Sequence, residues 1–375
     1  MKAVDVVVIG GGLVGTAIAY GLSRCVQRVL VLDEGDQALR ASRGNFGLVW
    51  VQGKGTGLSP YATWTRTSAS LWPTLAEDLF AQTDINVQLR QPGGFHLCFS
   101  DAEMAARNAS LETLRESLGG DYPYVMLDHA EVKAKLPALG PEVVGASYSP
   151  MDGHVNPLKL LRALHTASQL RQVQILTGTR AERIESAAGG FTIHTSSGSY
   201  SAARVVLAAG LANRTLAEQI GLNVPVGPNR GQVLVGERVR RLLDYPTTYI
   251  RQTDEGTIQI GDSHEDVGFD DGTTTDVLAS IAQRGIRSFP MLAQLKLVRV
   301  WGALRVLSLD GFPIYQESGL YPGAFVATCH SGVTLAAAHA LRLAPWIAGG
   351  APPAGIEHFS SERFRTYQPT SNHAH

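Results

Sequence analysis

The chain has 375 residues, of which 44% are hydrophobic and 17% are charged. This balance is typical of a folded globular protein and excludes a globally disordered chain. At about 150 residues per domain, the length predicts two or three domains. The 32 basic and 33 acidic side chains leave a formal charge of −1, so no surface for nucleic acid is indicated.

Three cysteines, Cys25, Cys98 and Cys329, lie far apart in the sequence. Their odd number and the absence of C-x-x-C spacing argue against a disulfide framework, a zinc site and a self-contained iron–sulfur cluster, so we predict no metal. Such cysteine usage suits a reducing compartment. Because the N-terminus lacks signal-peptide features and no apolar run is long enough to span a bilayer, we predict a cytoplasmic protein without a membrane span.

A strand, a glycine-rich turn, a helix and a second strand follow one another at the start of the chain. Residues 3–9 form a β-branched run, typical of a buried parallel strand. Residues 10–15 then have the spacing G-x-G-x-x-G, and an apolar helical pattern covers 13–23. The second strand, 28–32, ends at Asp33. In this structural context the glycine motif indicates a dinucleotide site.

Each residue of the motif has a physical role. Gly10 permits a tight turn, Gly12 lets a pyrophosphate approach the backbone, and Gly15 lets the helix pack close to the strand. The N–H groups that open the helix, around Leu13 and Val14, are expected to face the phosphates.

The acidic residues after the second strand narrow the choice of dinucleotide. Asp33 can accept hydrogen bonds from ribose hydroxyls. Glu34 stands where a 2′-phosphate would need an arginine, which disfavours NADP. The fingerprint does not separate NAD from FAD. Since no second copy of it occurs, we predict one bound dinucleotide.

The rest of the chain alternates between helical and strand-like patterns. In chain order we predict a helix at 60–81, strands at 87–90 and 94–99, helices at 101–118 and 158–169, strands at 173–176, 181–184, 190–195, 198–201, 204–210, 231–235, 248–252 and 257–262, and helices at 276–288 and 333–347.

This alternation predicts an α/β fold made of two interleaved units. One is a Rossmann-like dinucleotide-binding domain and the other an antiparallel-sheet substrate domain. The predicted boundaries are 1–82, 150–221 and 305–367 for the first domain, 83–149 and 222–304 for the second, and 368–375 for a disordered tail.

Further segments are weak signals alone but specific in their order and spacing. They are the strand that ends Ala-Ala-Gly at Gly210, and residues 230–232, 256–263, 302–305, 310–314 and 330–334. Together with the glycine motif they resemble the FAD-dependent oxidoreductases related to D-amino-acid oxidase. Within that family the chain is similar to a bacterial subgroup that includes glycine oxidase, the flavin subunits of hydrogen cyanide synthase and opine oxidase, and D-hydroxyproline dehydrogenase. Residues 45–55 resemble the hydroxyproline and opine members more than the true oxidases.

The resemblance implies FAD, held without a covalent bond. Sarcosine oxidases attach flavin through a cysteine in the segment that matches 302–305, and this chain has none there. The amides of Gly332, Val333 and Thr334 are expected to open the C-terminal helix and to stabilise the charge of reduced flavin. The other positions that match the family's cofactor site are Gly10, Gly12, Gly15, Asp33, Ser42, Asn45, Ala181, Ala209, Gly210 and Gly302.

The same resemblance points to the substrate site. Arg305 matches the arginine that grips a substrate carboxylate, for which a guanidinium is suited. Tyr249 resembles a pocket tyrosine, although a half-buried strand tyrosine is an equal alternative. Arg251 would share its face of the strand, as a second clamp or, more simply, as a solvated side chain. His330 and His264 could accept a proton or could be structural histidines.

We therefore predict an FAD-dependent dehydrogenase or oxidase of a secondary or primary amino acid, with a D-hydroxyproline-like or opine-like substrate favoured. Hydride would pass from the carbon next to the amine to flavin N5, leaving an imine. Three alternatives stay open: a nicotinamide dehydrogenase, a glycine- or sarcosine-type oxidase using oxygen, and a flavin protein that works only with partner chains. Lys54, in a loop near the flavin, is predicted to be solvated.

Overall fold

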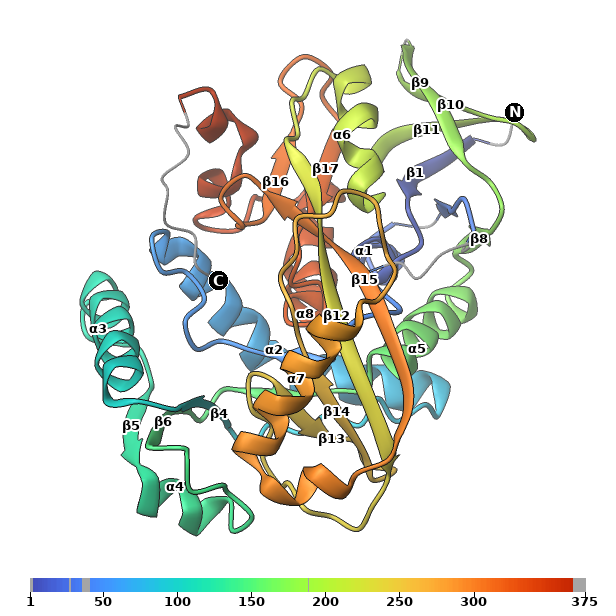
Figure 1. The fold of residues 1–375 in the computed structure, drawn as a ribbon. Coiled ribbons are helices and arrows are strands. Elements are labelled where there is room, and N and C mark those ends of the chain that lie inside the picture. Colours follow the sequence, from blue (N-terminus) through green and yellow to red (C-terminus); the bar gives the residue numbers. More distant parts are fainter. Residues whose placement is uncertain (1–2, 27, 36–40, 188, 367–375) are drawn as a thin grey trace.

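The computed structural model describes residues 3–26, 28–35, 41–187 and 189–366 (Figure 1). The tail predicted to be disordered, 368–375, lies outside the described residues. None of the helices described is long and apolar enough to cross a bilayer. The fold is mixed α/β, as predicted, with one mainly parallel sheet and further antiparallel sheets.

The largest sheet has eight strands, in the order β16-β17-β11-β1-β2-β8, with the β9–β10 hairpin attached to β11. Neighbours from β17 to β8 pair in parallel, and β16 is antiparallel. The strands are β1 (Ala3–Ile9), β2 (Val29–Leu32), β8 (Gln174–Leu176), β9 (Ala181–Ala187), β10 (Gly190–Thr195), β11 (Gly198–Leu207), β16 (Ile314–Glu317) and β17 (Ala324–Thr328).

The central strand β1 is covered on both faces, as its β-branched run predicts. Val6 and Val8 pack in one core cluster with Ile18 of the first helix, whereas Val7 packs in another with Ile220. The first face carries α1 (Leu13–Leu22), α2 (Ser59–Thr83), α8 (Ala336–Ala338), η4 (His339–Leu343) and α9 (Ala344–Ile347), with α5 (Pro157–Leu170) packed on α1 and α2; the second carries η1 (Gly210–Ala212), α6 (Asn213–Leu216) and η2 (Ala217–Ile220).

An antiparallel sheet in the order β13-β14-β12-β15 forms the second layer. Figure 1 shows the long pair β12–β15 running from the parallel sheet down to β13, β14 and α7. Its elements are β12 (Val226–Arg238), β13 (Ile250–Gln252), β14 (Thr257–Gly261), α7 (Thr275–Ser288), η3 (Pro290–Gln294) and β15 (Leu297–Ser308).

A smaller antiparallel sheet, β4-β6-β5, packs against this second layer. Phe95 of β4 shares a core cluster with Ile250 and Ile260, so the two sheets form one hydrophobic core. The remaining elements are β3 (Leu48–Val49), β4 (Gly94–Cys98), α3 (Asp101–Ser117), β5 (Val125–Asp128), α4 (His129–Lys135), β6 (Gly145–Ser149), β7 (Gly153–His154), η5 (Ile356–Phe359) and η6 (Ser361–Phe364).

Four predicted elements differ from the structure. Residues 87–90 form no strand, because Gln88 has φ +59° and its N–H bonds the side chain of Asn86 at 2.7 Å. The two strands predicted at 198–201 and 204–210 are one continuous strand, β11. The C-terminal helix begins at Ala336 rather than Val333.

Candidate functional site

The glycine motif forms the turn between β1 and α1. Gly10 has φ +108°, and a Cβ there would lie 2.4 Å from the carbonyl oxygen of Ala208. A Cβ on Gly15 would lie 1.9 Å from the carbonyl oxygen of Gly10. Neither position can hold a side chain, so the glycines at both ends of the motif allow helix, turn and β11 to meet.

The N-terminus of α1 leaves donors available. The Leu13 N–H donates to the Ser42 hydroxyl at 2.9 Å. Within the described residues, the N–H groups of Gly12 and Val14 make no hydrogen bond. A helix N-terminus with unpaired N–H groups is an anion site, and it fits a pyrophosphate.

Asp33 lies beside this turn, at the carboxyl end of β2. Its two carboxylate oxygens accept hydrogen bonds from Gly11 N–H at 2.7 Å and from Gly35 N–H at 2.9 Å. Each oxygen keeps a lone pair for a further donor. The neighbouring Glu34 lies 3.7 Å from the guanidinium of Arg180.

A second flank approaches from β9 and β11. The Thr179 N–H donates to the Asp33 carbonyl at 2.7 Å, which brings Ala181, at the start of β9, close to the turn. The Ala209 N–H donates to the Asn213 side chain at 2.9 Å, and Gly210 adopts φ +60°.

The C-terminal arm closes the site. Gly332, Val333 and Thr334 form a turn ahead of α8, not its first residues as predicted. A Cβ on Gly332 would lie 3.5 Å from the side chain of Val14. In the described part of the chain, the N–H groups of these three turn residues have no acceptor. Successive unpaired amides beside the phosphate turn fit the electron-rich edge of a flavin.

The loop before α2 is tied to this arm. Thr334 donates to the Leu48 carbonyl at 3.2 Å and accepts from the Trp50 N–H at 3.1 Å. Asn45 holds the same loop, because its side chain accepts from the Gly47 N–H at 2.7 Å.

Lys54, predicted to be solvated, is instead half-buried in a polar cluster. Its ammonium group lies 3.1 Å from His330 Nε2 and 3.0 Å from the Ser331 hydroxyl. The Tyr61 hydroxyl donates to Ser331 at 3.0 Å. Burial lowers the pKa of Lys54 to about 8, so its charge is costly here. When Lys54 is charged, its ammonium group can only donate, so His330 Nε2 is the acceptor of this contact, and His330 Nδ1 lies 3.2 Å from the Gly311 carbonyl oxygen.

Arg305 is held by its own chain. It pairs with the Asp262 carboxylate and donates to the Ser263 carbonyl at 2.8 Å and to Asn229 at 3.2 Å. A Cβ on Gly231 would lie 2.3 Å from its guanidinium, so the glycine of the Arg-Gly-Gln segment makes room for it. His264 lies 4.0 Å from the same Asp262 carboxylate and is 40% exposed.

Gly302 has a packing reason of its own. A Cβ there would lie 2.4 Å from the carbonyl oxygen of Gly272 and 2.6 Å from that of Asp271. The glycine thus lets β15 contact the loop before α7.

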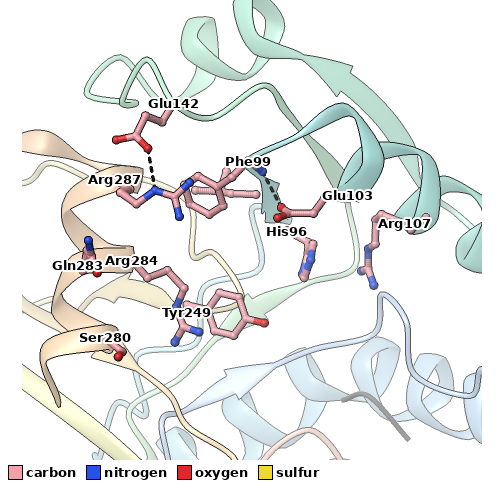
Figure 2. Close-up of a pocket in the computed structure, with 12 residues that line it drawn as sticks. His96, Phe99, Glu103, Arg107, Glu142, Tyr249, Ser280, Gln283, Arg284 and Arg287 are labelled. Atoms are coloured by element: carbon pink, nitrogen blue, oxygen red, sulfur yellow. Dashed lines mark hydrogen bonds and ion pairs between the residues drawn. The ribbon is translucent and has the colours of Figure 1, made fainter. Parts of the chain in front are cut away.

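Tyr249 lines a pocket of about 830 Å³ between α3 and α7 (Figure 2). The guanidinium of Arg284 lies 3.8 Å from its ring centroid. Arg284 Nη2 also donates to the carbonyls of Gly261 and Asp262, at 2.7 and 2.8 Å. Asp262 therefore lies between two guanidiniums, since Arg305 bonds its side chain.

Two further arginines near this site carry no signal in the sequence, and a third has other surroundings than predicted. Arg107 and Arg284 lie in helices with no motif around them, so only the folded chain shows that they share a pocket. Arg251, expected in its simpler reading to be solvated, is 2% exposed. It donates to the Val155 carbonyl at 3.1 Å and lies over the Phe46 ring, with 5.7 Å to the centroid.

Comparison with known proteins gives matches over nearly the whole chain. A family model described as FAD dependent oxidoreductase matches residues 5–346. An opine oxidase subunit of Agrobacterium tumefaciens is 43% identical, over 98% of this chain and all of the relative. Hydrogen cyanide synthase subunit HcnC of Pseudomonas protegens is 26% identical over 98% of this chain and 97% of that protein.

The fold agrees with these matches. The crystal structure of glycine oxidase from Geobacillus kaustophilus superimposes with a TM-score of 0.89, at 26% identity over 96% of this chain and 98% of that one. The unpaired amides in the turn between β1 and α1 and at residues 332–334 are compatible with such a cofactor. The chain belongs to the FAD-dependent oxidoreductases related to D-amino-acid oxidase, and its cofactor is FAD.

Proposed function

We propose that this chain oxidises the C–N bond of a secondary amino acid. An opine-like substrate is favoured, and a D-hydroxyproline-like substrate is the second choice. The observation that supports the opine-like substrate most is the 43% identity with an opine oxidase subunit along the entire relative. Of the two residues that would hold such a substrate, Arg305 binds the Asp262 carboxylate, and Tyr249 stacks on Arg284, which binds the Asp262 carbonyl.

FAD, when bound, supplies a two-electron acceptor. The substrate carbon next to the nitrogen gives up its hydrogen with the bonding electrons. The nitrogen lone pair forms the double bond of an iminium ion, which releases its N–H proton to solvent to give the imine, and water then adds to the imine carbon and releases the amine. Only a neutral amine has that lone pair, so the protein has to orient a deprotonated substrate.

For the cofactor, we propose that the phosphates bind the N-terminus of α1 and that Asp33, with Glu34 beside it, binds the ribose. Ser42 and Asn45 would hold the loop beside the flavin without a covalent bond. The other positions in this proposal are Gly10, Gly12, Leu13, Val14, Gly15, Ala181, Ala209, Gly210, Gly302, Gly332, Val333 and Thr334. The division into FAD-binding and substrate-binding domains is part of the same proposal.

For the substrate, Arg305 is the proposed carboxylate ligand. In the part of the chain described, its Nε–H makes no hydrogen bond and can reach a carboxylate without breaking the pair with Asp262. Tyr249 would contact the same substrate through its hydroxyl. His330, which contacts Lys54, is proposed to act beside the flavin, and His264, which lies near Asp262, at the rim of the site.

The chain is also proposed to be one component of a larger enzyme that passes electrons to partner chains. The names of two relatives, a subunit of opine oxidase and the HcnC subunit of hydrogen cyanide synthase, support this multi-chain form of the proposal. A glycine- or sarcosine-type oxidase that uses oxygen is the alternative. We also propose that the protein is located in the cytoplasm.

The test is anaerobic bleaching of the bound flavin by a panel of octopine, D- and L-hydroxyproline, proline, sarcosine and glycine. Bleaching by octopine or D-hydroxyproline ahead of glycine is the expected result. Turnover with an artificial dye but little with oxygen would support the multi-chain form, and fast turnover with oxygen would support the oxidase. A flavin that no amine in the panel bleaches would refute the proposal.

A further inference from the structure

The pocket between α3 and α7 holds more positive charge than its own acids neutralise (Figure 2). Arg287 is paired with Glu142 at 2.7 Å. The carboxylate of Glu103 accepts from the Phe99 N–H at 2.7 Å, as part of the cap of α3. Both acids of the pocket are therefore engaged. Arg107 and Arg284 make no ion pair with any carboxylate in the described residues.

Arg284 is fixed in position but keeps free donors. Its Nη2 binds the carbonyls of Gly261 and Asp262, and the guanidinium stacks on Tyr249. Its Nε is buried without a hydrogen-bond partner among the residues described. A buried N–H without an acceptor is destabilising, so the arrangement favours a ligand that accepts hydrogen bonds.

Arg107 reaches the pocket from the opposite wall. Its Nε donates to the Ser147 hydroxyl and its Nη2 to the Gln52 side chain, both at 2.9 Å. The third nitrogen, Nη1, makes no hydrogen bond among the described residues and lies 2.8 Å from the position that a Cβ on Gly53 would take. This side chain therefore lies next to the loop that carries Lys54.

The groups between the two arginines suit an anion. The hydroxyl of Tyr249 points toward the wall that carries His96 and Arg107 (Figure 2). The His96 ring bonds the Thr248 hydroxyl at 3.0 Å. Burial and the two nearby arginines lower the pKa of His96 to about 3, so the ring is neutral. Glu103, the acid on this side, accepts from the Phe99 N–H, and neither it nor Glu142 forms an ion pair with Arg107 or Arg284 in the described residues.

We propose that Arg107 and Arg284 bind a second carboxylate of the substrate, remote from the one that Arg305 takes. The substrate class is then an amine with carboxylates on two separate arms, an N-(carboxyalkyl) amino acid. This inference rests on the proposed function and deepens it. It is supported by Asp262, whose backbone binds Arg284 and whose side chain binds Arg305, so the two guanidiniums flank one residue.

The test compares N-(1-carboxyethyl)alanine with N-ethylalanine, which has the same skeleton without one carboxylate. Both are used as reductants of the FAD-loaded protein under anaerobic conditions, in its complex if partners co-purify. The measured quantity is the ratio of their apparent dissociation constants. The wild type is expected to prefer the dicarboxylate by roughly 10- to 100-fold, the value of one or two charged hydrogen bonds.

The variants R284Q and R107Q should each reduce this preference by about tenfold or more. R284K, which keeps the charge but loses the planar guanidinium that binds a carboxylate through two N–H groups, should retain an intermediate preference. R162Q is the control, because Arg162 is exposed on α5 and does not line the pocket, so its loss removes one positive charge without freeing an acid there. It should leave the preference unchanged. Circular dichroism and FAD content report whether each variant folds.

Calorimetric titration with the unreactive ether analogues of both compounds gives a second readout that needs no turnover. Equal binding of the two ethers by the wild type, or an unchanged preference in R284Q and R107Q, would overturn the subsite. Equal weakening of both ligands in the variants would also overturn it, since it would assign the arginines to the first carboxylate. If neither amine bleaches the flavin but the dicarboxylate ether binds selectively, the proposed function fails and the subsite stands.

Discussion

Replacement of Lys54 by methionine should stabilise the protein near neutral pH. The ammonium group is half-buried beside His330 and Ser331, and burial lowers its pKa from 10.5 to about 8. Each tenfold change in proton affinity is worth about 1.4 kcal/mol, so the folded state carries a cost of about 3 kcal/mol while the lysine is charged. Methionine fills a similar volume without the charge, although it gives up the two hydrogen bonds.

The pH dependence of stability separates the cost of the buried charge from the loss of the two hydrogen bonds. Between pH 8 and 10.5 the unfolded chain binds a proton at Lys54 that the folded protein has lost, so the stability of the wild type rises with pH in this window. Below pH 8 the cost is constant. The lost hydrogen bonds add a constant at all pH values, so the advantage of K54M over the wild type should shrink by about 3 kcal/mol between pH 8 and 10.5.

The assay is urea unfolding of both proteins at a series of pH values, with FAD at one saturating concentration. Lys296→Met is the matched control, because that lysine is exposed. It should change the unfolding free energy by less than about 0.5 kcal/mol throughout. Parallel curves for K54M and the wild type up to pH 10.5 would refute the reasoning, since they would show that Lys54 keeps its ordinary pKa.

Three further predictions use different contacts. Arg305→Ala should weaken binding of carboxylate substrates by about 2 kcal/mol in anaerobic flavin titrations, and an unchanged affinity would remove Arg305 from the site. Gly21→Ala should lower the melting temperature, because its Cβ would lie 2.1 Å from the Ala340 carbonyl oxygen, whereas Gly319→Ala, with open space around it, should not. In the native protein a thiol reagent should label exposed Cys25 quickly. Burial raises the pKa of Cys98 to about 11 and that of Cys329 to about 12, so these two should react only after unfolding. Fast labelling of all three cysteines would contradict this.

The first part of the fold was predictable because its signals are local. The run at residues 3–9 is buried on both faces, and the glycines of the turn stand where a Cβ has no room. The apolar run and the glycine motif are both short and local, so they predict these elements without reference to the rest of the chain.

The predictions that were wrong depend on tertiary surroundings. Gln88 has a side chain suited to an exposed strand, but the Asx turn from Asn86 redirects its backbone. Arg251 and Lys54 are buried because distant segments cover them, which no local pattern records. The pocket arginines escaped notice for the same reason, since Arg107 and Arg284 meet only when α3 and α7 face each other.

The contact between α1 and the end of the chain has a consequence for synthesis. Gly21 packs directly on Ala340, and Val14 lies beside Gly332. A ribosome makes these partners more than three hundred residues apart, so the part of α1 that packs on this arm stays uncovered until residues 332–340 have emerged, although β1, β2 and α5 can cover the rest earlier. This apolar surface is therefore exposed in the nascent protein. A product truncated before this arm would keep it exposed to chaperones and proteases.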